Sequence, residues 1–167
     1  DGKFDTNNLP KLKKFFWQSP YFKDFSFAKS QDLELLAANR PTGSIKINAD
    51  LGNKPKLKDI TFQDVNLSKL SVSNATAANL LKDNSSSAEV VEFDNIAPDQ
   101  AVSYIKRTAR DKTKSITLKN IALTEDQLLE LISGLGATNG TLTIKSDLLT
   151  AKVKSELEKI KWAGVAL

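Results

Sequence analysis

The feature that most constrains the fold is a short motif that recurs four times along the chain. Each copy alternates apolar and polar residues and ends in Asp, Asn or Ser, and the copies occupy residues 60–64, 91–95, 116–120 and 142–146. Their first residues are 31, 25 and 26 positions apart, which is close to the period of leucine-rich repeats. The alternation predicts short strands with one buried face, and residues 25–27 and 45–48 repeat it at less regular spacing.

After the second, third and fourth motifs, the apolar spacing changes to that of a helix. Pro98 suits a first helical turn. Thr124 with Gln127 three positions later is a capping-box pattern, and Gly134 and Gly136 are expected to end the helix that follows. A third helix is expected to begin at Thr150. The unit is therefore strand, turn, helix, turn.

We expect a single domain over residues 1–167 of the α/β class, built as a leucine-rich-repeat-like solenoid with a curved parallel sheet and helices on its convex side. Residues 1–44 are expected to form an N-terminal cap and irregular first units, and residues 45–167 the repeat units. The strands at residues 60–62, 91–93, 116–118 and 142–144 should be parallel neighbours in that order. Asp64, Asn95, Asn120 and Ser146 would then hydrogen-bond to turn backbone where the chain leaves each strand.

Two segments carry a resemblance to a known family. Residues 66–83, with Leu70 and Leu80 at the family's apolar positions, resemble one copy of the surface-protein repeat of bacterial BspA-like proteins, a leucine-rich-repeat subclass. Residues 142–162, ending in Lys161 and Trp162, are similar to the closing unit of such proteins. The resemblance implies a bacterial cell-surface or secreted protein that binds proteins or glycans and has no catalytic site.

The residue types that are missing exclude several kinds of function. The chain has no Cys and no His, which rules out thiolate nucleophiles, zinc sites built on these residues and imidazole catalysis. It also has no Met, so we expect a processed or excised fragment. An extracellular or cell-surface location is consistent with the lack of Cys, and no apolar run is long enough to span a bilayer.

Charge adds a weaker constraint on the partner. The formal net charge is +4, and the basic residues are spread among Asp and Glu along the chain. This distribution is typical of a solvated surface and does not favour a nucleic-acid partner. We expect no cofactor and no metal, and a protein or a glycan at a cell surface as partner.

The polar positions of the strands are the candidate binding residues. On the concave face of a solenoid they would form adjacent rows about 4.8 Å apart, with an acidic middle and basic flanks. The alternative is that they are ordinary solvated sheet residues. The candidates are Lys46, Asn48, Thr61, Gln63, Glu92, Asp94, Thr117, Lys119, Thr143 and Lys145.

Residues 12–27 hold most of the aromatic side chains, including Phe15, Phe16, Trp17 and Phe27. We expect them to cover the first edge of the solenoid, because an open stack of repeats exposes its core there. A stacking platform for single-stranded nucleic acid or sugars, or a membrane-surface segment, is the alternative, since lysines are interleaved with these rings.

Three functions compete at this point. The first is a non-catalytic recognition or adhesion module. The second is a structural protomer that self-associates through its terminal repeats, because residues 165–167 are apolar enough to form an edge strand. The third is a carbohydrate-active enzyme using Glu92 and Asp94. We predict that the chain is not an enzyme, because two acids on an open sheet lack the enclosing pocket that raises one pKa.

Overall fold

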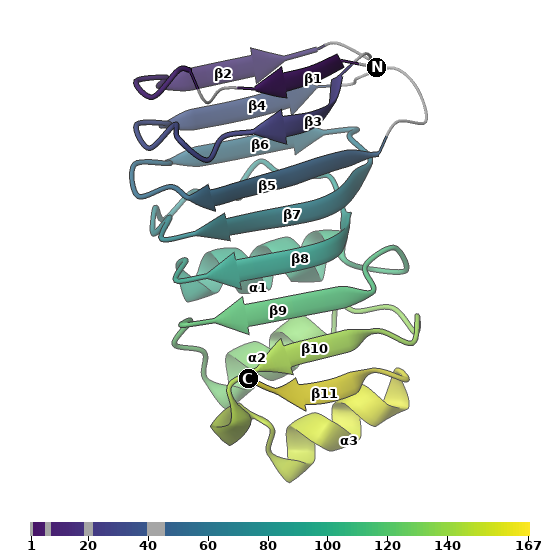
Figure 1. Cartoon of the computed structure of the whole chain (residues 1–167). Coiled ribbons are helices and arrows are strands. Elements are labelled where there is room, and N and C mark those ends of the chain that lie inside the picture. The colour runs from purple at the N-terminus through teal and green to yellow at the C-terminus, as the bar shows by residue number, and fades with distance from the viewer. Residues whose placement is uncertain (1, 6–7, 19–21, 40–45) are drawn as a thin grey trace.

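The computed structural model describes residues 2–5, 8–18, 22–39 and 46–167. Ile45 and Tyr21, which belong to the predicted strand at 45–48 and to the aromatic segment, lie outside the described residues. The described chain contains two sheets and three α-helices, and all strand pairs are parallel (Figure 1). The prediction of an α/β fold with a parallel sheet is confirmed.

The larger sheet has eight strands, which lie side by side in the order in which they occur in the chain. Three further strands, which alternate with the first of these in the sequence, form the second sheet. The eight are β1 (Gly2–Asp5), β3 (Phe22–Ser26), β5 (Ile47–Asn53), β7 (Leu67–Ser73), β8 (Ala88–Asp94), β9 (Ser115–Lys119), β10 (Thr141–Ile144) and β11 (Ala163–Ala166). The three-stranded sheet contains β2 (Lys14–Trp17), β4 (Leu35–Asn39) and β6 (Asp59–Gln63).

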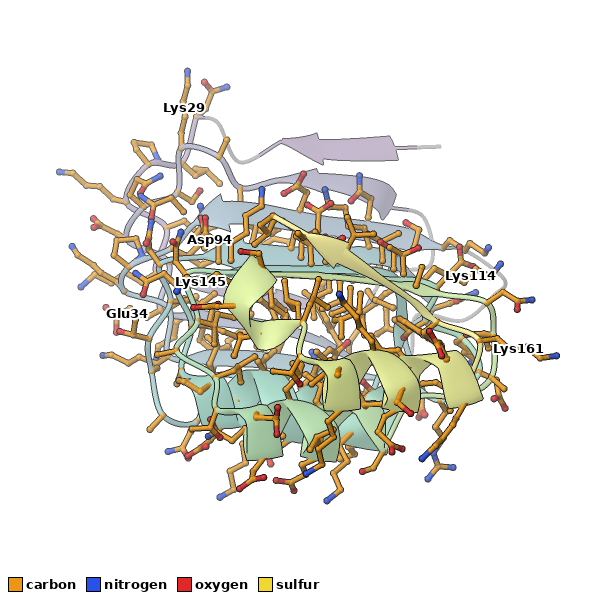
Figure 2. The ribbon with its side chains drawn as sticks, turned by 90° about the horizontal axis from the view of Figure 1, so that it is seen from below. Lys29, Glu34, Asp94, Lys114, Lys145 and Lys161 are labelled. Atoms are coloured by element: carbon orange, nitrogen blue, oxygen red, sulfur yellow. The ribbon has the colours of Figure 1, made fainter. Side chains whose placement is uncertain are left out.

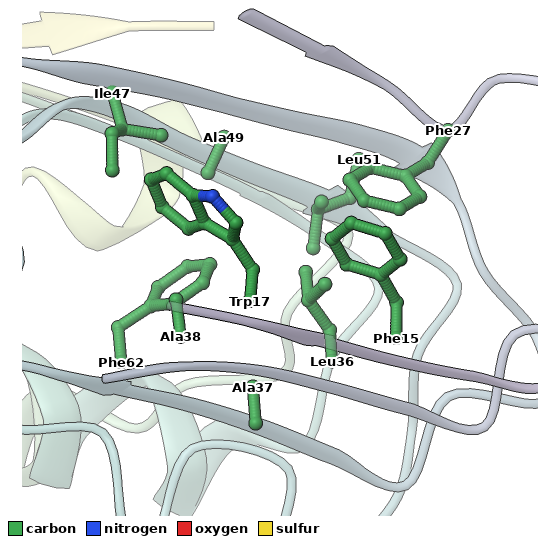
Figure 3. A pocket seen from close by; sticks show the side chains of 10 residues that line it. All are labelled: Phe15, Trp17, Phe27, Leu36, Ala37, Ala38, Ile47, Ala49, Leu51 and Phe62. Atoms are coloured by element: carbon green, nitrogen blue, oxygen red, sulfur yellow. The ribbon is translucent and has the colours of Figure 1, made fainter. Parts of the chain in front are cut away.

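In the N-terminal region the chain alternates between the two sheets, and their inner faces share one apolar core (Figures 1 and 3). Trp17 and Phe62 point inward from the three-stranded sheet toward Ile47 on β5. The Phe15 and Phe27 rings meet edge to face with centroids 5.4 Å apart. Trp17 and Phe27 are therefore residues of the core between the two sheets, whereas Phe16 is 68% exposed.

In the C-terminal region helices replace the second sheet. The helices α1 (Pro98–Thr108), α2 (Glu125–Ile132) and α3 (Ala151–Lys159) lie on the same side of the eight-stranded sheet (Figure 1). Each predicted start is confirmed, including the capping box between Thr124 and Gln127. Gly134 has a further role, because a Cβ there would lie 2.4 Å from the Cα of Lys106 on α1, so it lets α2 end close to α1.

The predicted order of the strands is wrong at residues 60–62. These residues lie in β6 of the three-stranded sheet, and the neighbour of β8 is β7. The inward residues Leu70 of β7 and Val91 of β8 are paired in register, 21 positions apart. The sequence misleads here because strands of both sheets bury one face in the same core and so show the same alternation.

A row of Asn side chains marks where the strands of the eight-stranded sheet end. Asn74, Asn95 and Asn120 have positive φ angles of 55°, 51° and 50°, a conformation that Asn tolerates better than most residues. Asn95 donates a 2.8 Å hydrogen bond to Oδ1 of Asn74, and Asn120 donates one of 2.7 Å to Oδ1 of Asp94. The Asn positions at 95 and 120 were predicted, but these side chains bond to a neighbouring turn's side chain instead of turn backbone.

Candidate functional site

The outer surface of the eight-stranded sheet is the candidate site. We call the outward-pointing side chains of β5 to β10 the outward face; it is opposite the helices and the three-stranded sheet (Figure 1). Parallel sheets are usually buried on both faces. Here no helix or sheet of the described residues covers the outward face, and its side chains are exposed or half-buried. These side chains include Asn48, Asp50, Lys69, Ser71, Val90, Glu92, Asp94, Thr117, Lys119 and Thr143.

Eight of the ten predicted binding residues lie on the outward face or just beyond the ends of its strands. They are Lys46, Asn48, Glu92, Asp94, Thr117, Lys119, Thr143 and Lys145. Asp94 and Lys145 lie at the end of the sheet where these strands finish, and Lys114 lies at the other end (Figure 2). Thr61 and Gln63 do not belong to this surface, because β6 is in the three-stranded sheet.

The centre of the outward face holds a lysine that the sequence analysis missed. Lys69 of β7 lies between Asp50 and Glu92, with its Nζ 3.5 Å from Oδ2 of Asp50 and 2.9 Å from Oε2 of Glu92. The hydrogen bond to Glu92 raises the pKa of Lys69. The predicted acidic middle is therefore partly neutralised. The pattern of Leu70, Ser71 and Val72 contains the signal, since it repeats the motif 21 residues before Val91.

Two of the remaining lysines at the border of the face, Lys46 and Lys145, are also paired. Lys46 Nζ lies 2.5 Å from Oε1 of Glu89, and this hydrogen bond lowers the pKa of the Glu89 carboxyl. Lys145 Nζ lies 2.6 Å from Oδ2 of Asp147. Lys119 has no ion pair among the described residues and extends from the end of β9. The face thus presents fixed, alternating charges surrounded by hydroxyl groups.

The acidic residues considered for catalysis have structural partners. Glu92 is paired with Lys69, and Asp94 accepts from Asn120. Each of these contacts uses a carboxylate that a hydrolytic acid pair would need.

Within the described parts of the chain, no group of three or more Asp and Glu side chains could hold a metal ion. None of the helices described there combines the length and apolar surface needed to cross a bilayer. The core of the N-terminal region encloses a gap of only about 10 Å³ beside Trp17 and Phe62 (Figure 3). A gap of that size is at the lower limit for one water molecule, and its apolar lining offers water no partner.

A second depression lies on the outer face of the three-stranded sheet. It has a volume of about 340 Å³ and is open to solvent. Phe16, Gln18, Asn39, Thr61 and Gln63 are among its lining residues. The structure therefore brings the two predicted residues that are absent from the outward face, Thr61 and Gln63, together with the exposed ring of Phe16.

No protein-family model, curated protein or solved structure matches the chain.

Proposed function

We propose that the chain is a non-catalytic recognition module that works outside the cell and binds a protein through the outward face. The ordered parallel strands with helices behind β8 to β10 support the interpretation as a leucine-rich-repeat-like solenoid over that region. The resemblance of residues 66–83 to BspA-like surface repeats is consistent with an adhesive role. This step is an analogy from fold to function, so the proposal depends on the surface itself.

The observation that carries the proposal is the uncovered polar face of a parallel sheet. Exposing such a face to water costs free energy only where the face is apolar. On strands β7 to β9, Val90 is the one large aliphatic residue that points outward. The face therefore stays soluble on its own. The backbone hydrogen bonds between its strands also hold the side chains in fixed positions, which reduces the entropy lost on binding.

The chemistry of the face favours a protein over a glycan. Lys69, Asp50 and Glu92 form a fixed charge pattern that complementary charges on a protein can match. Glycan sites usually offer an aromatic ring to the sugar, and strands β5 to β10 point no aromatic side chain outward. The only aromatic residue of β5, β7, β8, β9 and β10 is Phe93, which is buried.

Site-directed photo-crosslinking tests the proposal. A crosslinking residue at Thr117 would lie in the middle of the outward face, and the matched control at Lys154 would lie on the exposed side of α3. We expect the Thr117 probe, and not the Lys154 probe, to capture a discrete protein from the extracellular fraction of the source culture. Lys69→Glu should weaken that capture, and Lys154→Glu should not. Capture from Lys154 alone would move the interface to the helices and contradict the proposal.

An exposed edge favours self-association as a second candidate function. All four residues of β11 are exposed, and Val165 and Leu167 are 42% and 53% exposed. Only β10 pairs with β11 among the described strands, so one row of its backbone groups is free to pair with another chain. Light scattering over a range of concentrations tests this: association lost in Val165→Lys would support it, and a monomer at high micromolar concentration would exclude it.

A further inference from the structure

We propose that the depression on the three-stranded sheet is a separate binding site for a neutral, β-1,4-linked glycan. It is on a different face from the protein site proposed above and does not depend on that proposal. Its parts are the ring of Phe16, a floor of small side chains, and a rim of three amides.

The floor is set by strand register. Phe16 of β2 is paired with Ala37 of β4, and Ala37 with Thr61 of β6, so the three side chains form one outward row. Phe16 is the most exposed large apolar residue among those described, at 68%. Ala37 is too small to cover the ring, and the Thr61 hydroxyl is engaged by Asp59 Oδ1 at 2.9 Å. The row therefore offers a phenyl face followed by methyl groups, over roughly 10 Å for three strands.

The rim supplies hydrogen-bonding groups that are free. Asn39 and Gln63 are register partners at the ends of β4 and β6, and Gln18 follows β2. All three are exposed, and in the described part of the chain none of their amide groups bonds to another protein group. Each amide has an acceptor oxygen and two donor hydrogens, which is the combination that a pair of sugar hydroxyls can satisfy.

The charge of the lining selects the class of ligand. The eight lining residues among those described are uncharged, so in that part of the chain an anionic or cationic ligand would find no counter-charge. A neutral polyhydroxylated ligand matches it. The negative face of an aromatic ring attracts the weakly positive C–H groups on one side of a pyranose, while the hydroxyls at the ring's edge remain free for the amides.

The shape of the floor selects the linkage. The row of Phe16, Ala37 and Thr61 across three strands fits an extended ribbon of equatorially linked sugars, in which successive rings present C–H groups to one side. An α-1,4-linked glucan coils and would leave the row after one ring. The site therefore favours cellohexaose over maltohexaose.

Titration calorimetry of the full chain with cellohexaose and maltohexaose tests the proposal. We expect cellohexaose to bind more tightly, and Phe16→Ala to weaken its binding by about ten-fold or more, the equivalent of one aromatic contact. Phe16→Tyr should keep the affinity within about three-fold, because the ring remains. Gln63→Ala should weaken binding by about five-fold, the effect of one lost hydrogen bond.

The matched control is Thr117→Ala on the outward face, which should leave cellohexaose binding unchanged. Phe16 is exposed, so circular dichroism of Phe16→Ala should show an intact fold. Failure of cellohexaose to bind at millimolar concentration would overturn the proposal. So would equal affinity in the wild type and Phe16→Ala, tighter binding of maltohexaose, or occupation of the depression by a second copy of the chain, seen as self-association that Phe16→Ala abolishes.

Discussion

The N-terminal and C-terminal regions solve the same packing problem with different elements. In the first, β2, β4 and β6 cover the inner face of the large sheet, and in the second α1, α2 and α3 cover it. A five-residue strand such as β6 and an eleven-residue helix such as α1 both span about 16 Å. A helical unit therefore needs more residues to cover the same sheet.

The spacing of inward residues follows this rule. The successive register partners Ala49, Leu70 and Val91 are 21 residues apart, whereas Val91, Ile116 and Leu142 are 25 and 26 apart. The period thus lengthens where helices enter the covering layer. It stays at 21 residues both in the unit that contains β6 and between β7 and β8, where turns take the place of a covering strand. The change in period also explains why a search with one fixed period of about 25 residues finds the C-terminal units and misplaces the earlier ones.

The largest expected effect comes from truncating the core of either region. Leu36→Ala on β4 and Leu131→Ala on α2 each remove a buried aliphatic side chain and should each cost about 2–5 kcal/mol of unfolding free energy. Because one contiguous apolar cluster runs through both regions, both variants should still unfold in a single urea transition. Two separate transitions in either variant would show that the regions unfold independently.

A buried lysine distinguishes the N-terminal region, and replacing it should have the next largest effect on stability. Lys54 follows Asn53, the last residue of β5, and its side chain is inaccessible to solvent. Its Nζ donates a 3.1 Å hydrogen bond to the Asn53 carbonyl. Burial lowers the pKa of Lys54 from its ordinary value of 10.5. Lys54→Met, which has a similar length and no charge, should stabilise the fold at pH 7, because it removes an ammonium group that is buried with a neutral carbonyl as its acceptor.

The same lysine makes the stability depend on pH. Its folded-state pKa is below its unfolded-state pKa, so between the two values the unfolded chain binds more protons. Stability should therefore rise as the pH increases from 7 through the lowered pKa toward 10.5, and this part of the rise should be absent in Lys54→Met. Lys82→Met, at an exposed position, is the control. The assignment of Lys54 to the interior would be contradicted if both variants had the same stability curve against pH.

Much of the C-terminal region was predictable because its signals are local. The capping box at Thr124 and Gln127, and the N-cap at Thr150, depend on residues three positions apart, and both are present. Thr61 and Gln63 could not be placed in the same way. Their strand has one buried face like those of the large sheet, and only pairing between distant segments decides which sheet it joins. Lys69 was missed because its strand lies 21 residues before the motif at Val91, which differs from the spacing of about 25 residues between the later motifs.

The row of Asn side chains at the strand ends crosses the junction between the two regions. A substitution in this row should have a moderate effect on stability. Asn95→Ala removes the side-chain hydrogen bond to Asn74. It also places alanine, which has a Cβ and no polar side-chain group, at a φ of 51°. We expect a loss of about 1–2 kcal/mol, from the backbone conformation together with one partly exposed hydrogen bond. Asn95→Gly should cost less, because glycine adopts this conformation freely. Equal losses in the two variants would assign the effect to the hydrogen bond alone.

The smallest effects are expected on the outward face, where the two regions are continuous. Lys69→Met removes the ion pairs with Asp50 and Glu92, whose side chains are 52% and 44% exposed, so solvent screens these charges and the loss should stay below about 1 kcal/mol. Lys119→Ala should change stability by less than about 0.5 kcal/mol. Its neighbour on β9, Leu118, is 3% exposed, and Leu118→Ala should cost about 2–5 kcal/mol. Urea midpoints of the three variants measure this contrast directly. If Lys119→Ala and Leu118→Ala shifted the midpoint equally, the assignment of inward and outward residues on β9 would be wrong, and the proposed protein-binding face would be wrong with it.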